Sequence, residues 1–214
     1  MTGAGANGAP AAPERVSVRM HQVGFGDSLL VSFGYRKALP DGRDERHVLI
    51  DFGSTRWPKG RKPAYRQIAD SVAERTGGLL DAIVITHRHK DHIGGFADKP
   101  AADTIAALRP RVVLRPWTED PKAASNATAP EALGAGSVGH VQSLRAAHEF
   151  AEAAMERIPA TTRGLRMELR DLAEDQLPNA EAIERIDALA TAGRGLYLHA
   201  GKRSGLESRL TIWK

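Results

Sequence analysis

The stretch Thr86-His87-Arg88-His89-Lys90-Asp91-His92-Ile93-Gly94-Gly95 decides how the rest of the chain is interpreted. It follows a short apolar run rich in Ile and Val, residues 79–86, which predicts a buried strand. Three of the eight histidines in the chain fall within this stretch, next to an aspartate. Imidazole nitrogens and carboxylate oxygens are common ligands of zinc and related metals. The stretch therefore predicts a metal-binding loop directly after a strand; the alternative is a polar loop whose histidines cluster by chance.

The spacing within this loop indicates what it could hold. His87 and His89 are two positions apart, so in an extended chain their side chains project to the same side. Asp91 and His92 follow, before the Gly-Gly pair that predicts a tight change of direction, and can turn toward a second ion about 3.5–4 Å from the first. The chain has no cysteine, so a metal must be held by His and carboxylate. This ligand set suits zinc, with manganese or iron as alternatives, and predicts hydrolysis by a metal-activated hydroxide.

The sequence before the loop predicts a strand-rich region. Residues 16–20 and 28–33 are apolar or alternating runs separated by Gly24-Phe25-Gly26-Asp27, which predicts a β-hairpin. The further elements expected up to residue 117 are a strand at 47–51, a helix at 65–75 that stops at Gly77-Gly78, a helix at 101–108 and a strand at 111–115.

The composition changes after Trp117. Residues 121–136 are rich in Ala, Pro, Ser and Asn and predict a loop, and residues 138–157 have the periodicity of an amphipathic helix. Residues 179–190 predict another helix with Asn179 as its N-cap, followed by a strand at 196–199.

Three motifs resemble one family. His-x-His-x-Asp-His-x-Gly-Gly, residues 87–95, resembles the signature of the metallo-β-lactamase superfamily. His21-Gln22-Val23-Gly24-Phe25-Gly26-Asp27-Ser28-Leu29-Leu30 resembles the opening hairpin of its ComEC-like, competence-protein-related branch. Leu49-Ile50-Asp51-Phe52-Gly53-Ser54 resembles the family's strand that ends in Asp-x-Gly. The resemblance implies an α+β fold, the αββα sandwich, with the metals at the edge between its two sheets.

The resemblance also implies roles for individual residues. His87 and His89 would hold a first zinc ion, and Asp91 and His92 a second, with Asp91 also counted as catalytic. Asp51 would orient the site; the alternative for this residue is a helix-capping or turn aspartate. Asp27 is expected to fix the hairpin turn.

Downstream, the family supplies a His, a bridging Asp and a final His from later strands. This chain offers only His140 and His148, in a predicted helix, and His199, which ends a predicted strand and is the best candidate for a further ligand. We therefore expect the chain to lack the C-terminal half of the fold. The expected organisation is a disordered tail at 1–13, the N-terminal half of the domain at 14–117, a loop and helical insertion at 118–195, and the start of a truncated second half at 196–214.

The charge and composition bear on substrates and location. The net charge is +4, and a loop with five cations and no acid follows Asp51. Arg61 and Lys62 are therefore candidate contacts for an anion; the alternative is a solvated surface loop without a role in binding. No apolar run is long enough for a membrane span, and the absence of cysteines and of a secretory signal favours the cytoplasm. The function expected is hydrolysis of a phosphodiester or another small anionic substrate. The alternatives are a catalytically incomplete metal-binding fragment and a nucleic-acid-binding module without catalysis.

Overall fold

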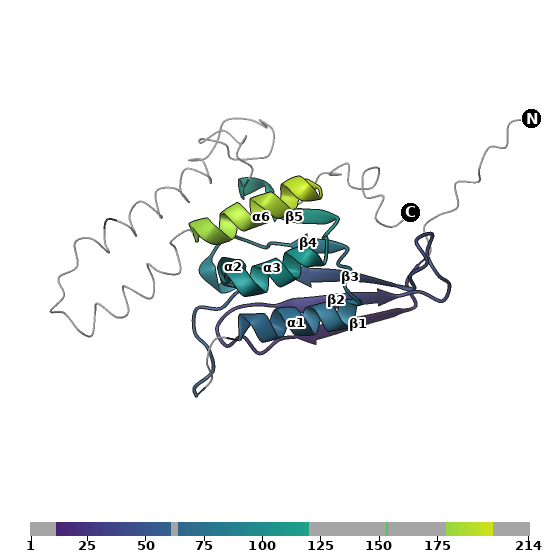
Figure 1. Cartoon of the computed structure of the whole chain (residues 1–214), viewed down its shortest axis with the longest axis horizontal. Coiled ribbons are helices and arrows are strands. Elements are labelled where there is room, and N and C mark those ends of the chain that lie inside the picture. Colours follow the sequence, from purple (N-terminus) through teal and green to yellow (C-terminus); the bar gives the residue numbers. More distant parts are fainter. Residues whose placement is uncertain (1–11, 61–63, 120–152, 154–178, 199–214) are drawn as a thin grey trace, which may run out of the picture.

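The computed structural model describes residues 12–60, 64–119, 153 and 179–198. These residues form an α+β fold with one mixed six-stranded sheet in the order β1-β2-β3-β4-β5-β6 (Figure 1). The strands are β1 (Arg15–Met20), β2 (Leu29–Gly34), β3 (Glu45–Ile50), β4 (Ala82–Val84), β5 (Val112–Pro116) and β6 (Gly195–Leu198). The helices are α1 (Tyr65–Thr76), α2 (Lys90–Ala97), α3 (Lys99–Ala107) and α6 (Ala180–Ala192), with a short 3-10 turn, η1 (Trp117–Glu119).

The strand directions bring several chain segments to one edge of the sheet. β1, β2 and β3 are antiparallel neighbours, whereas β3 pairs with β4, β4 with β5 and β5 with β6 in parallel. The carboxyl ends of β3 to β6 therefore lie at the same edge as the turn between β1 and β2. The predicted hairpin and the predicted third strand are confirmed.

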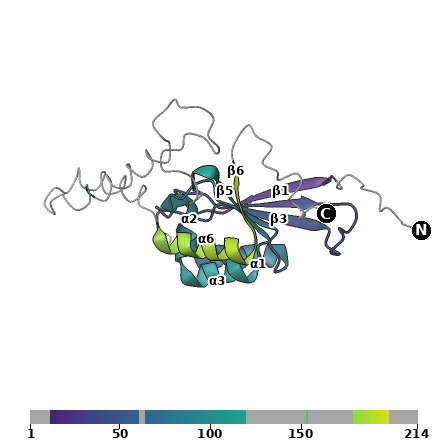
Figure 2. The same ribbon diagram turned by 90° about the horizontal axis from the view of Figure 1, so that it is seen from above.

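Of the described helices, α1, α3 and α6 cover one face of the sheet (Figure 2), and α2 contributes side chains to the same core. Leu30, Leu49, Ile83 and Val113 occupy successive positions across that face and lie in the core. The helices contribute the other large core side chains, which include Ile68, Val72, Ile93, Phe96, Ile105 and Ile186. Burial of this apolar surface is the main force that holds the helical layer on the sheet.

The opposite face of the hairpin is apolar and exposed. Val16, Val18 and Met20 alternate along β1 with exposed fractions of 55%, 61% and 75%. Their register partners on β2 are Phe33, Val31 and Leu29, which are also apolar. A band of apolar side chains on the face away from the described helices is an unusual feature for a small domain.

A buried ion network lies where β3 and β4 begin, at the edge of the sheet opposite their carboxyl ends. Asp81 is fully buried and accepts hydrogen bonds from the His47 backbone N–H at 2.8 Å and from Arg43 Nη1 at 3.1 Å. Arg46 is only 1% exposed; its Nε is 3.6 Å from Asp81 and its Nη1 donates to Asp41 at 2.9 Å. The network supplies partners to charges that would otherwise be costly to bury.

Two predictions for residues 79–97 differ from the structure. Residues 90–97 form helix α2, whereas the sequence predicted a loop turning at Gly94-Gly95. Both glycines are buried within the helix, and a Cβ at Gly95 would lie 2.6 Å from the Phe52 ring. The helix thus packs where a larger side chain would not fit. β4 is also shorter than the predicted strand at 79–86, because its pairing with both neighbours is confined to 82–84.

Other predicted elements agree with the structure. α1 ends at Gly77, which adopts the left-handed conformation at φ 60°, as expected for a glycine C-cap. The Asn179 side chain caps α6 by accepting from the Ala182 N–H. The predicted loop at 121–136 and nearly all of the helix at 138–157 lie outside the described residues.

Candidate metal centre

Asp51 directly follows β3, and its hydrogen bonds connect the end of this strand to the end of its parallel neighbour, β4. Its backbone N–H donates to Val84 O at 2.9 Å, while its carboxylate accepts from the Thr86 N–H at 2.8 Å and from Thr86 Oγ1 at 2.6 Å. Asp51 has a φ of 54°, a conformation that Asp and Asn adopt more readily than other non-glycine residues. Strained backbone of this kind is concentrated at functional sites. The side chain is 2% exposed and is therefore held in one position.

The same carboxylate determines how His92 presents its ring. His92 Nδ1 lies 2.8 Å from Asp51 Oδ2, so Nδ1 carries the proton and donates it. In the neutral ring Nε2 then has a free lone pair. Nε2 lies 3.2 Å from Asp91 Oδ2. Two zinc ligands at tetrahedral angles are about 3.3–3.4 Å apart, so this pair of atoms is spaced to share one ion.

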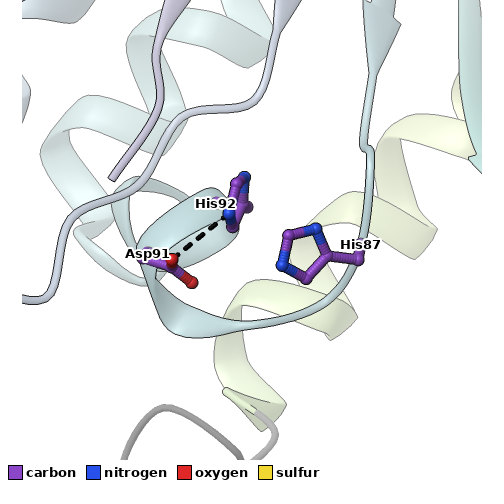
Figure 3. A group of neighbouring side chains, drawn as sticks. All are labelled: His87, Asp91 and His92. Atoms are coloured by element: carbon purple, nitrogen blue, oxygen red, sulfur yellow. Dashed lines mark ion pairs between the residues drawn. The ribbon is translucent and has the colours of Figure 1, made fainter. Parts of the chain in front are cut away.

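Asp91 supplies an observation that favours a cation. In the part of the chain that the structure describes, its Oδ1 is buried and has no hydrogen-bond donor. His87 leaves the loop after β4 with its ring toward α2, where Asp91 and His92 occupy the first turn (Figure 3). Ligand atoms of these three residues lie within 4.8 Å of one another. A buried carboxylate oxygen without a donor, beside two imidazoles, fits a bound metal ion.

The two imidazoles differ in their electrostatics. Burial lowers the pKa of His87, and the neighbouring His92 and His89 lower it further, so His87 is held neutral and ready to ligate. Burial alone would also lower the pKa of His92, but its hydrogen bond with Asp51 and the negative charges of Asp51, Asp91 and Asp27 raise the pKa overall. The carboxylates around His92 therefore stabilise positive charge at this point of the site.

Main-chain hydrogen bonds fix the loop after β3 against the N-terminal turn of α2. The Phe52 N–H donates to His92 O and the Gly95 N–H donates to Phe52 O, each at 2.7 Å. A Cβ at Gly53 would lie 2.5 Å from the Asp91 carbonyl and the His92 nitrogen. Gly53 of the Asp-x-Gly segment therefore has a steric role. Because it has no side chain, α2 can approach the end of β3.

The remaining predicted site residues fall into two groups. His89 is the N-cap residue of α2 and its ring centroid is 4.7 Å from that of His87, but it belongs to neither of the possible metal-binding groups found in the described residues. His140, His148, His199, Arg61 and Lys62 lie outside the described residues.

One residue near the site was not expected there. Asp27 was assigned to the hairpin turn from the sequence, yet its Oδ2 lies 3.5 Å from His92 Nδ1, and Asp27, Asp51 and His92 form a second group that could hold an ion. The Gly-x-Gly-Asp pattern was visible in the sequence, but its contact with α2 depends on tertiary structure.

Comparison with known proteins gives a partial match. No protein-family model matches the chain. A stretch of 68 residues is 40% identical to transcription termination factor FttA of Thermococcus kodakarensis and covers 28% of this chain and 10% of that protein. The chain thus spans only about a tenth of that relative's length. Among the described residues, no helix has the length and apolar character needed to cross a membrane.

Proposed function

We propose that this protein is a metal-dependent hydrolase of the metallo-β-lactamase type. The observation that carries the proposal is the buried Asp91 Oδ1, which lacks a donor among the described residues and lies beside His87 and His92. When bound, a zinc ion would supply a Lewis acid and an ionised water as nucleophile near neutral pH. Manganese or iron would suit the same His and Asp donors.

In this proposal, individual residues would bind the metal ions or orient the residues that bind them. His87 and His89 would hold a first ion, and Asp91 and His92 a second. Asp51 would keep the proton on His92 Nδ1, so that Nε2 remains directed at the metal, which is the usual role of a carboxylate behind a ligating imidazole. Asp91 would also accept a proton at its carboxylate during turnover. His199 remains a prediction for a further ligand, and β6, which ends at Leu198, runs parallel to β5.

For the fold, we propose that a second sheet completes an αββα sandwich. The apolar band of β1 and β2, with Val16, Val18 and Met20 more than half exposed, supports this arrangement, because stacked sheets bury such faces against each other. The metal centre would then lie at the edge between the two sheets.

For the substrate, we propose a phosphodiester or another anion. The loop after Asp51 carries cations, and Phe25 in the β1–β2 turn bridges to Arg56 at its start, so the loop begins next to the site. Arg61 and Lys62 would attract the substrate's negative charge. FttA is named as a transcription termination factor, which is consistent with a nucleic-acid substrate.

The proposal is tested by measuring metal content and turnover together. Elemental analysis gives metal per chain, and release of nitrophenol from bis(p-nitrophenyl) phosphate gives diesterase activity. We expect bound metal and turnover in the wild type and the loss of both in His92→Ala and His89→Ala. His47→Gln, a buried histidine that bonds Ser32 rather than the site, is the matched control. Equal metal content and activity in His92→Ala and wild type would refute the proposal.

A second candidate is a metal-binding protein without turnover. It is favoured by one observation: in the described residues, both groups that could hold an ion come from residues 27–92 and share His92. Metal content that depends on His92, together with no hydrolysis of any phosphodiester offered, would favour this candidate.

A further inference from the structure

The turn between β1 and β2 carries a carboxylate to the metal centre. Asp27 is held there by its main chain: its N–H donates to Asp91 O at 3.1 Å, and its carbonyl accepts from the Gly53 N–H at 3.0 Å. The two neighbours of Asp27 in these bonds belong to α2 and to the loop after β3. These two backbone hydrogen bonds of Asp27 therefore go to the two segments that carry His92 and Asp51, rather than to its own hairpin.

A close steric fit keeps the turn in this place. Gly26 has a φ of 149°, and a Cβ at this position would lie 2.5 Å from both Asp91 O and Gly53 O. The turn therefore touches the backbone of α2 directly. Because the contact is made by main-chain atoms, the Asp27 side chain is not required to hold the turn and remains available for another purpose.

Among the described residues, the Asp27 carboxylate lies near two ionisable side chains, the His92 imidazole and the Asp51 carboxylate, and ligand atoms of the three lie within 4.8 Å of one another. Asp27 Oδ2 lies 3.5 Å from His92 Nδ1, and no lysine or arginine of the described residues forms an ion pair with it. Its other side borders an open cavity of about 540 Å³. Most of the residues that line the cavity belong to the turn between β1 and β2, and none of them is a lysine or an arginine. A half-exposed carboxylate is thus placed beside His92, and within the described ranges no lysine or arginine is paired with it.

We propose that Asp27 is a positioning residue of the metal centre. This inference rests on the proposed metal site and adds a residue to it. Asp51 and Asp27 enclose the Nδ1 side of His92 with two carboxylates, and only Asp51 is within hydrogen-bond distance. Asp27 acts through its charge: it favours the ring with its proton on Nδ1 and stabilises the positive charge that His92 gains when Nε2 ligates a metal.

The test compares metal affinity in matched variants. Zn²⁺ affinity is measured by competition with a chromogenic chelator, and the Co²⁺ absorption spectrum reports the ligand geometry. Asp27→Asn removes the charge and keeps the shape, and we expect it to weaken Zn²⁺ binding about tenfold and to alter the Co²⁺ bands. Asp27→Glu restores the charge and should bind within about threefold of wild type. Asp44→Asn, an exposed aspartate in another loop, controls for net charge and should match wild type.

The outcomes separate this inference from the proposed function. If His92→Ala weakens Zn²⁺ binding and Asp27→Asn does not, the metal site stands and Asp27 is only a turn residue. If the wild type binds no Zn²⁺ or Co²⁺, both proposals fail. Thermal unfolding of each variant shows whether the turn is intact, and histidine ¹⁵N chemical shifts report the His92 tautomer directly. An unchanged tautomer and affinity in Asp27→Asn would overturn the inference.

Discussion

Asp51 and His92 are 41 positions apart in the sequence, yet Asp51 Oδ2 and His92 Nδ1 lie 2.8 Å from each other. This contact joins the end of β3 to the first turn of α2. It also fixes which ring nitrogen of His92 is free. The orientation of the His92 ring therefore depends on a residue that follows β3, far from His92 in the sequence.

The first prediction concerns this contact. We expect Asp51→Asn to lower Zn²⁺ affinity by about 10- to 100-fold, because an amide can also donate to Nδ1 and so permits the wrong tautomer. The fold should persist, since Asn tolerates the φ of 54°. Chelator competition measures the affinity and urea unfolding measures the stability. Equal Zn²⁺ affinity in Asp51→Asn and wild type would show that Asp51 does not orient the ligand.

The second prediction concerns the glycine inside α2. In Gly95→Ala the new methyl group would lie 2.6 Å from the buried Phe52 ring and 2.7 Å from Phe52 O, so α2 must shift. We expect a loss of about 2–3 kcal/mol in the free energy of unfolding, measured in urea. Gly77→Ala, where a Cβ meets open space, is the control and should cost only about 1 kcal/mol for its left-handed conformation. A smaller loss in Gly95→Ala than in Gly77→Ala would contradict this packing argument.

The third prediction concerns the buried ion network. Asp81→Ala removes a partner of Arg43 and Arg46 and leaves the buried Arg46 only partly compensated. We expect a loss of about 3–5 kcal/mol in the free energy of unfolding. Asp70→Ala, which removes an exposed pair with Arg66, should change it by less than about 0.5 kcal/mol. Similar urea midpoints for the two variants would mean that the network contributes little.

The fourth prediction concerns stability at acid pH. Arg75, through a hydrogen bond and its charge, and Arg15 hold the pKa of Glu45 down to about 2. Because the folded-state pKa lies below the unfolded value, this stabilisation is fully present above about pH 4.5 and is lost as the pH falls toward 2. We expect a contribution of about 1–2 kcal/mol, since Arg15 is largely solvent-exposed. Urea unfolding between pH 2 and 6 should show a smaller loss of stability at acid pH in Glu45→Gln than in wild type, and equal slopes would refute this role.

Local sequence signals predicted the elements but not their contacts. The alternation at 16–20 and the glycine-rich turn predicted the hairpin, because period and turn chemistry are local properties. The strand at 196–199 was also expected, but its parallel pairing with β5 brings together residues about 80 positions apart. No local pattern contains that information.

The helix at 90–97 shows where local preference is overridden. Two adjacent glycines are poor helix formers and predicted a turn. In the structure they lie in α2 because Tyr65 and Phe52 pack where side chains would otherwise stand. The candidate ligands at 87, 89, 91 and 92 were proposed from the sequence, whereas the proximity of Asp27 to His92 depends on how a turn, a strand end and a helix meet.

The order of the sheet has a consequence for biosynthesis. The groups around His92 all belong to the stretch from Asp27 to His92, and the strands and helix that carry them precede the other parallel strands in the chain. A ribosome would therefore have made every one of these donors before it reached β5. Because nascent chains fold from their N-terminal end as they emerge, the hairpin and the first parallel crossover can assemble early, so these residues of the proposed metal site can come together during translation rather than after it.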